Sequence, residues 1–254
     1  MKSFIIDKLK EILLSTTGFL VVLLIWIYYS RQMNPLILPS PLDTCRAFMD
    51  IYNSGDLFSN LFITIRRTFI GYGLALVIGF LIALILNKSN TLYIITRPLI
   101  TVIQTTPPVI WLALAVIWFG IADNLTPIFL IFVVTLPIIF VNIFEGLQDI
   151  DQNLIEMAEV YQAEHREIIF DIFVPSLIPY IFSALSIGLA FAWKSTIFAE
   201  FLGSNSGVGF ALSMANSNLN TDKLFAWAIV LIVLMLTIEY LIIKPIQKKV
   251  TRWK

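Results

Sequence analysis

Cysteine, histidine and charged residues are all scarce in this sequence of 254 residues. It contains one cysteine, Cys45, and one histidine, His165. A single cysteine excludes an internal disulfide, and a single histidine leaves too few ligands for a metal site built from His and Cys. Charged residues make up 13% of the chain, whereas soluble globular domains contain about a quarter. The composition therefore does not fit a water-soluble globule.

Three further features that the sequence lacks narrow the possible activities. Acidic and basic residues balance to a formal net charge of zero, so nothing indicates a nucleic-acid partner. No stretch matches G-x-x-x-x-G-K-[ST], the loop whose backbone amides hold nucleotide phosphates. The apolar segments also lack a facing pair of carboxylates, so a membrane enzyme is a poor interpretation. We expect no catalytic, metal or cofactor site in this chain.

Apolar residues, in contrast, are abundant. They form 58% of the chain, and the mean hydropathy is +0.87. This composition is typical of a polytopic all-α membrane protein, whose spans of about 20 residues cross about 30 Å of hydrocarbon. We interpret residues 1–254 as a single transmembrane domain. Six runs of about the required length are predicted to be its membrane helices: 12–29, 69–86, 99–119, 127–144, 177–202 and 225–243.

The first apolar run follows Lys2, Lys8 and Lys10, as the core of a secretory signal peptide would. However, the run 12–29 is longer than a usual signal core, and no small-x-small cleavage site follows it. We therefore predict a retained membrane anchor. Farther on, three prolines give the segment after Asn34 an irregular start, and a short amphipathic helix is predicted from Leu42.

The placement of Lys and Arg predicts the orientation, because basic residues are retained on the cytoplasmic side of a membrane. With the N-terminus inside, the inner segments hold more of them than the outer segments do. The inner set is Lys2, Lys8, Lys10, Lys88, Arg97, Arg166, Lys244, Lys248, Lys249, Arg252 and Lys254. The outer set is Arg31, Arg46, Arg66, Arg67 and Lys223. We predict that both termini are cytoplasmic, with Arg66 and Arg67 snorkelling to headgroups or lining a cavity.

Two runs carry helix-packing and helix-breaking signals. In the second run, small residues recur every four positions and stack on one helix face, which favours close helix packing in a bilayer. They are Gly71, Ala75, Gly79 and Ala83. In the third run, adjacent prolines remove two backbone donors at membrane depth, which is tolerated against other protein or a wet cavity. The resulting candidates for lining a transport pathway are Gln104, Thr105, Thr106, Pro107 and Pro108, although a merely kinked packing helix is the alternative.

The fifth run contains two ionisable residues, Lys194 and Glu200. Charges at hydrocarbon depth are costly, so both are candidates for a role in transport. They are six residues apart, which places them on different faces of a helix, and we do not expect them to pair with each other. The alternative for Lys194 is that its stem snorkels toward the interface.

The segment "EMAEVYQAEHREIIFDIFVP", which ends at Pro175, is charged where its surroundings are apolar. Its apolar residues fall near one helical stripe, which predicts an amphipathic helix pair with a turn near residues 162–165. Asp151 or Asn153 can cap the start, and Pro175 is expected to limit the far end. An acidic surface suits anionic headgroups badly, so a protein partner is the better interpretation.

This segment and the run that follows resemble the EAA loop and next helix of bacterial ABC-importer permeases, most closely the nitrate/sulfonate/taurine type. The positions of the family pattern fall on the coupling-loop residues Glu156, Met157, Ala158, Gln162, Ala163, Val174 and Pro175. "AEFLGSNSGVG", "LPSPLDT" and "WFGIADN" match the family as well. Two positions depart from it: Met157 replaces an alanine, and Gln162 replaces the glycine that makes the turn. Since glycine adopts left-handed backbone conformations cheaply, we expect a different turn or some strain here.

The resemblance implies a type I importer permease with about six membrane helices in the inner membrane. The loop 145–175 between the fourth and fifth spans would be a coupling helix that seats on a cytoplasmic ABC ATPase. ATP would be bound by that partner, in two copies, and an extracytoplasmic solute-binding protein would deliver a small anion or sulfonate-like solute. A second permease copy, in a homodimer, is expected to complete the pathway. A secondary transporter or channel is the alternative, but it leaves the charged segment without a purpose.

Overall fold

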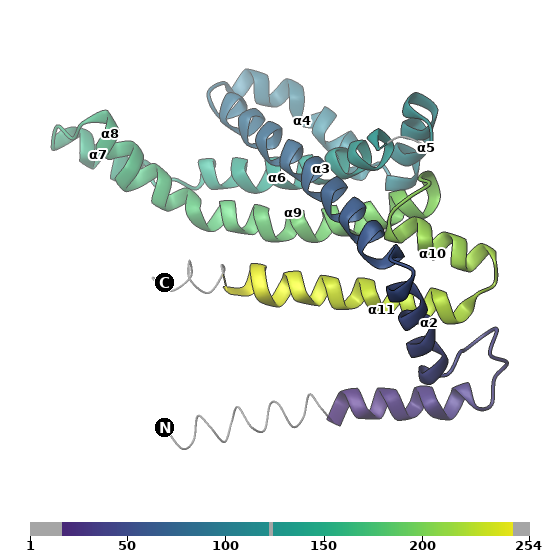
Figure 1. The fold of residues 1–254 in the computed structure, drawn as a ribbon. Coiled ribbons are helices and arrows are strands. Elements are labelled where there is room, and N and C mark those ends of the chain that lie inside the picture. The colour runs from purple at the N-terminus through teal and green to yellow at the C-terminus, as the bar shows by residue number, and fades with distance from the viewer. Residues whose placement is uncertain (1–16, 122–123, 246–254) are drawn as a thin grey trace, which may run out of the picture. The chain divides into compact units, whose positions relative to one another are not determined.

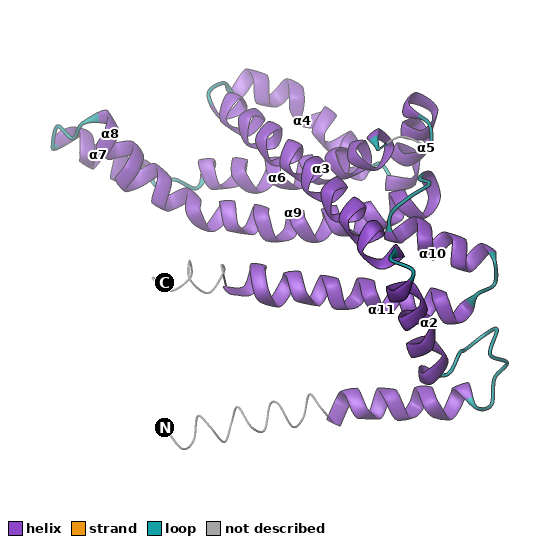
Figure 2. Ribbon diagram, in the orientation of Figure 1, coloured by secondary structure: helices purple, strands orange, loops and turns teal. Residues whose placement is uncertain are grey.

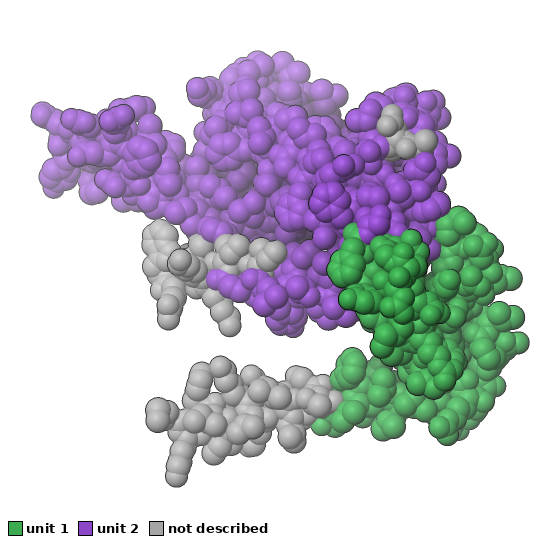
Figure 3. Space-filling model, in the orientation of Figure 1, with its two compact units in different colours: residues 1–58, 212–230 green, residues 59–211, 231–254 purple. Residues whose placement is uncertain are grey.

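The computed structural model describes residues 17–121 and 124–245, and throughout that part of the chain the regular structure is helical (Figures 1 and 2). The chain divides into two compact units (Figure 3). Unit 1 combines residues 1–58 with 212–230, and unit 2 combines 59–211 with 231–254. Each unit therefore joins segments that are distant in the sequence.

Unit 1 contains the short apolar helix Thr17–Ser30, helix α2 (Pro41–Asn53) and most of α11 (Thr221–Ile238). Helix α2 begins where Ser40 accepts a hydrogen bond from the Asp43 amide at 3.2 Å and proline occupies the first turn, where no donor is needed. The helix predicted from Leu42 is thus confirmed. In the predicted first span, residues 12–16 lie outside the described part of the chain.

The loop between the first helix and α2 is held by side chains of unit 1. The Trp26 indole Nε1 donates to the Pro39 carbonyl at 3.0 Å, and its ring lies 5.8 Å from that of Phe225. The Thr221 hydroxyl donates to the Leu36 carbonyl at 2.7 Å. These bonds satisfy carbonyl groups of a proline-rich segment that forms no ladder of its own.

Unit 2 is built around α6 (Leu125–Gln148), which packs along α9 (Val174–Gly203) and also contacts α4 (Asn90–Thr105) and α5 (Pro108–Phe119). In the most apolar part of α6, 61% of residues are buried, against 17% in the helix that includes α9. Helix α6 is therefore the central element. The unit also contains most of α3 (Asp56–Asn87). Its remaining elements are α7 (Gln152–Val160), α8 (His165–Glu167), the π-helical segments η1 (Ile168–Phe173) and η2 (Glu239–Ile243), and the start of α10 (Val208–Ser217).

Within residues 17–121 and 124–245, four helices are long and apolar enough to cross a membrane: Asp56–Asn87, Leu125–Gln148, His165–Gly203 and Thr221–Leu241. They confirm the predicted all-α polytopic class. The third run predicted over 99–119 is broken, because α4 and α5 are bent by 93° there and form either one broken span or a re-entrant pair. Thr106 is extended, with φ −69° and ψ 124°, and Pro107 follows with φ −55° and ψ 137°. A residue before proline is driven out of the helical region, so two adjacent prolines end one helix and start the next.

The predicted small-residue face of α3 packs on α6, as expected. Ala75 and Ala83 are fully buried. A Cβ atom built on Gly71 would lie 2.7 Å from Cβ of Ile131 and 2.9 Å from a backbone carbonyl oxygen of α6. At Gly79 the nearest contact would be 3.1 Å. The two helix backbones therefore approach as closely as these residues allow.

Gly71→Ala is expected to destabilise the protein by about 1–3 kcal/mol, because the added methyl must displace the α6 backbone. The matched control is Gly73→Ala, two residues along the same helix, where an added Cβ meets nothing within 4 Å. That change is expected to be neutral or slightly stabilising, since alanine favours a helix more than glycine does. Thermal unfolding of the purified variants measures both effects. Equal melting temperatures for the two would contradict the close approach of α3 and α6.

Candidate functional site

A buried ion pair joins α3 to the end of α9. Arg67 and Glu200 are 1% and 0% exposed, and the Arg67 Nη1 donates to the Glu200 Oε1 at 3.0 Å. The other carboxylate oxygen accepts from the Thr64 hydroxyl at 2.8 Å and from the Gly209 amide at 3.1 Å. Burying a charge is costly unless it is paired and fully hydrogen-bonded, and both conditions are met here.

The same arginine fixes the loop that follows α9. Its Nη1 and Nη2 donate to the carbonyl and the hydroxyl of Ser206 at 2.7 and 2.9 Å, and its Nε donates to the Asn124 side chain at 2.9 Å. Gly207 has φ +99°, and a Cβ atom there would lie 2.2 Å from a Glu200 carboxylate oxygen. The Gly-rich sequel to α9 is therefore needed for the backbone to approach the carboxylate.

These positions differ from what the sequence alone favoured. Snorkelling is wrong for Arg67, which points inward, whereas its neighbour Arg66 is exposed. Glu200 and Lys194 do not pair with each other, as expected, because Glu200 takes its partner from α3. The missed signal was the spacing of Thr64, Arg67 and Thr68, which puts a polar face on one side of α3.

Arg67→Met is expected to destabilise the protein by about 3–5 kcal/mol, because it leaves the Glu200 carboxylate buried without a counter-charge. Arg66→Met, one residue away and exposed, is the matched control and should change the melting temperature little. Adding Glu200→Gln to Arg67→Met should recover part of the loss, since neither charge then remains. A double variant as unstable as the sum of its single variants would contradict direct coupling.

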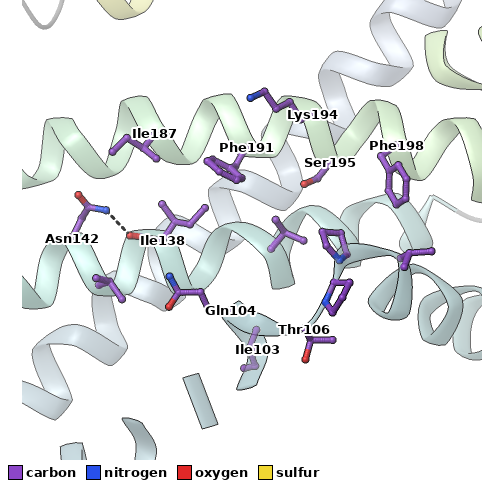
Figure 4. Close-up of a pocket in the computed structure, with 15 residues that line it drawn as sticks. Ile103, Gln104, Thr106, Ile138, Asn142, Ile187, Phe191, Lys194, Ser195 and Phe198 are labelled. Atoms are coloured by element: carbon purple, nitrogen blue, oxygen red, sulfur yellow. Dashed lines mark hydrogen bonds between the residues drawn. The ribbon is translucent and has the colours of Figure 1, made fainter. Parts of the chain in front are cut away.

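A cavity of about 870 Å³ lies where the broken helix α4–α5 faces α6 and α9 (Figure 4). Its walls are mostly apolar, and its polar side chains come from three of these elements. The lining residues are Ile103, Gln104, Thr106, Pro107, Pro108, Val109, Val134, Ile138, Val141, Asn142, Ile187, Phe191, Lys194, Ser195 and Phe198. Because Pro107 and Pro108 bend the chain away from a straight path, the break itself forms part of the wall.

The polar lining groups differ in whether they already have partners. The Asn142 amide donates to the Ile138 carbonyl at 2.8 Å and accepts from the Ser183 hydroxyl at 2.8 Å. The Thr106 hydroxyl donates to the Val102 carbonyl at 2.6 Å. Figure 4 shows Ser195 pointing from α9 toward the side of Gln104, whereas Lys194 leaves the same helix on the other side. Lys194 therefore lies at the edge of the cavity.

The cavity collects most, but not all, of the sequence-predicted pathway candidates. Gln104, Thr106, Pro107, Pro108 and Lys194 line it. Thr105 is not among the lining residues; its hydroxyl donates to the Thr101 carbonyl at 2.8 Å. Glu200 is enclosed in its ion pair instead. Two lining residues, Ser195 and Asn142, were not predicted from the sequence. Ser195 could have been found, because it follows Lys194, an ionisable residue within an apolar run.

The charged segment forms the expected helix pair. Asp151 caps α7 by accepting from the Asn153 amide at 2.9 Å, and α7 ends at Val160. After a short turn, Glu164 and Glu167 form a capping box at the start of α8. The turn at 162–165 is thereby confirmed. Glu156 and Met157 are exposed on α7, and Ala158 and Ala163 are half-buried.

Gln162 makes the turn that glycine makes in the family pattern. Its φ is +56°, in the left-handed region. The Ala163 amide donates to the Ala158 carbonyl at 3.0 Å, and the Gln162 amide donates to the Glu159 carbonyl at 2.9 Å. This pair of bonds is the Schellman ending of a helix, whose left-handed residue is usually glycine. The turn is therefore of the ordinary kind, with backbone strain at Gln162.

The prediction that Pro175 limits the helix is wrong. Helix α8, the π-helical segment η1 and α9 run on as one helix from His165 to Gly203. The Val174 amide donates to the Ile169 carbonyl, five residues back, so the turn before Pro175 is wider than an α-turn. A wider turn makes room for a proline ring, which clashes with the carbonyl four residues back in a regular α-helix.

Gln162→Gly is expected to stabilise the helix pair by about 1 kcal/mol, because glycine adopts a left-handed conformation without a Cβ clash. Glu159→Gly, within α7, is the matched control and should destabilise by a similar amount. Hydrogen exchange at the Ala163 amide, which closes the turn, measures both. Faster exchange in the Gln162→Gly variant would contradict the strained turn.

One continuous membrane helix leads from the exposed charged hairpin to the cavity at the broken helix. This arrangement is typical of a membrane transport component. Residues 75–252 match the binding-protein-dependent transport system inner membrane components, and the chain belongs to that family. It is 25% identical to the taurine transport system permease protein TauC of Escherichia coli, over 96% of this chain and 90% of TauC. It is 29% identical to the nitrate import permease protein NrtB of Synechococcus elongatus, over 80% of this chain and 76% of NrtB.

A solved structure supports the fold. A chain of the MetNI methionine ABC transporter, in an inward-facing conformation, aligns with a TM-score of 0.64 at 20% identity. The alignment covers 75% of this chain and 94% of that chain. At this identity the likeness concerns the fold alone, and that fold is the type I importer permease fold predicted from the sequence.

The family assignment decides between the interpretations of the sequence. The chain is the permease subunit of a binding-protein-dependent ABC importer and not an enzyme, and the alternative of a secondary transporter or channel is wrong. It is a multi-pass inner membrane protein. Transport of this kind also uses an ATPase and a solute-binding protein. In the described part of the chain, no cluster of three or more His, Cys, Asp or Glu residues could hold a metal ion.

Proposed function

We propose that this permease imports a small anion of the sulfonate or nitrate type, and that the cavity at the α4–α5 break is part of its pathway. The relatives TauC and NrtB are named for taurine, which carries a sulfonate, and for nitrate. The observation that carries the proposal is the cavity itself, which is lined by Gln104 and Ser195 among apolar membrane helices and has Lys194 at its edge. Polar groups at that depth are costly, so their gathering at one cavity favours a pathway.

The hairpin of α7 and α8 is the element that we expect to dock on the cytoplasmic ABC ATPase. Leu154 and Met157 on α7 and Tyr161, the residue that follows its last turn, are 43%, 53% and 80% exposed and lie along one side of the helix. The opposite face carries Glu156 and Glu159. An exposed apolar strip on a charged hairpin is typical of a protein interface. ATP is bound by that partner, since this chain contains no phosphate-binding loop.

The assembly would contain two copies of this chain, two ATPase subunits and one extracytoplasmic binding protein. Symmetric homodimers are the commonest oligomers, and a second permease copy would complete a pathway that one chain leaves open. Both termini and the hairpin lie in the cytoplasm in this arrangement, as the distribution of Lys and Arg favours. Closure of the ATPases would then rock the permease halves between inward-open and outward-open states.

Met157→Asp is expected to abolish coupling, because it places an uncompensated charge at the centre of the apolar strip. Burying such a charge costs several kcal/mol, which lowers docking affinity by orders of magnitude. Gln152→Asp is the matched control, since it adds the same charge on the opposite face of α7, in the first turn, where acids are favourable. Uptake and ATP hydrolysis are measured in proteoliposomes with the ATPase and binding protein.

We expect Met157→Asp to insert normally and to lose ATPase association, while Gln152→Asp retains both. Normal coupled uptake by a correctly folded Met157→Asp variant would show that the apolar strip of α7 is not the docking face. Equal losses in both variants would show that added charge, and not its position, is responsible.

A further inference from the structure

The cavity at the helix break is lined mostly by apolar residues, but one of its lining residues is charged. Lys194 is its charged residue, and none of the described lining residues is acidic. The charge at the edge of the cavity is therefore positive, and Lys194, which carries it, is exposed. A charge held between low-dielectric walls acts over a longer range than the same charge in water, because field lines are focused through the cavity.

Lys194 has no counter-ion within the described chain. The other charged residue at comparable depth in α9, Glu200, is fully enclosed and neutralised by Arg67 at 3.0 Å. The interaction that Lys194 does make is with the Phe191 ring, whose centroid lies 5.6 Å from the ammonium nitrogen. A cation–π contact at an exposed site contributes only about 0.5–1 kcal/mol and leaves the charge uncompensated.

Two neutral donors also face the cavity without a protein partner. Ser195 is only 6% exposed, and Figure 4 shows it on the side of α9 that faces away from Lys194 and toward α6. In the part of the chain that the structure describes, no hydrogen bond joins the buried Ser195 hydroxyl or the exposed Gln104 amide to another residue. The Asn142 amide, in contrast, is already engaged on both its oxygen and its nitrogen. The free polar capacity of the cavity therefore consists of an ammonium, a hydroxyl and an amide.

We propose that Lys194, Ser195 and Gln104 form an anion-selecting site in this cavity. The inference rests on the proposed function, in which the cavity is part of the pathway. Lys194 supplies the positive potential at the edge, and the Ser195 hydroxyl and the Gln104 amide donate to the oxygen atoms of a singly charged group. The apolar side chains around them, such as Ile138 and Phe198, contact the uncharged remainder of the solute. A cation of equal size is rejected by the same charge.

The charge preference can be measured without knowing the cargo. In a Cys45→Ser background, Val109→Cys places a reporter thiol on the cavity wall. Its modification rates by an anionic sulfonatoethyl and a cationic trimethylammonium-ethyl methanethiosulfonate are compared. We expect the anionic-to-cationic rate ratio to fall about tenfold when Lys194→Met is added, and to be retained in Lys194→Arg. A reporter at Val160→Cys, exposed on α7, is the matched control and should not respond.

Each other outcome of the labelling overturns the site. An unchanged ratio in Lys194→Met shows that the lysine does not set the potential of the cavity. Equal losses in Lys194→Met and Lys194→Arg show that packing, and not charge, is responsible. A reporter that reacts with neither reagent shows that water and ions do not reach the cavity, so that another segment of protein or lipid fills it.

Transport separates this inference from the function on which it rests. Uptake of a short alkanesulfonate and of nitrate is measured in proteoliposomes with the ATPase and binding protein. If the unmodified chain transports neither anion, the proposed cargo is wrong, and the labelling still decides the site. If it transports one, Lys194→Met should reduce kcat/KM at least about tenfold. Ser195→Ala should raise KM about fivefold through one lost hydrogen bond, with ATP hydrolysis retained. Unchanged uptake by Lys194→Met overturns the site alone.

Discussion

The ion pair between Arg67 and Glu200 is the contact on which the arrangement of this membrane domain depends. Hydrocarbon offers no partner to a charge, so an arginine on α3 and a glutamate on α9 must satisfy each other and bring their helices together. The bonds to Ser206 and Asn124 extend this constraint to the loop after α9 and to the start of α6. By neutralising Glu200, the pair also leaves Lys194, at the edge of the cavity, as the uncompensated charge of α9.

The second constraint is the absence of two backbone donors at Pro107 and Pro108. A straight helix through these residues would leave carbonyl groups unpaired in lipid. The chain instead turns by 93° between α4 and α5, and the bend faces α6 and α9. The irregular backbone thus lies at a cavity, where unpaired carbonyl groups are tolerated better than in lipid. Where no cavity is formed, the helices pack more closely, as α3 does at Gly71 against α6.

The hairpin and the cavity are connected by one continuous helix. From His165 to Gly203 the chain passes through the capping box of α8, the π-turn before Pro175 and the face that carries Lys194 and Ser195. The Tyr180 hydroxyl donates to Asp149, and the Tyr180 ring lies against Gly146. These contacts hold the first turns of α9 to the end of α6. A displacement of the hairpin would therefore reach the cavity wall through a stiff element, as rigid-body transitions require.

The sequence by itself determined the membrane class, the four long apolar helices, the small-residue face of α3 and the hairpin with its turn at Gln162, because each depends on local periodicity, composition or a short motif. It also located the proline break, since the donors that proline lacks are a local property. Only the tertiary structure decided that Arg67 pairs with Glu200, that Ser195 faces the cavity, and that the helix continues through Pro175 by means of a π-turn. Those outcomes depend on which partner is nearby in space, and a partner more than a hundred residues away leaves no periodic signal in the chain.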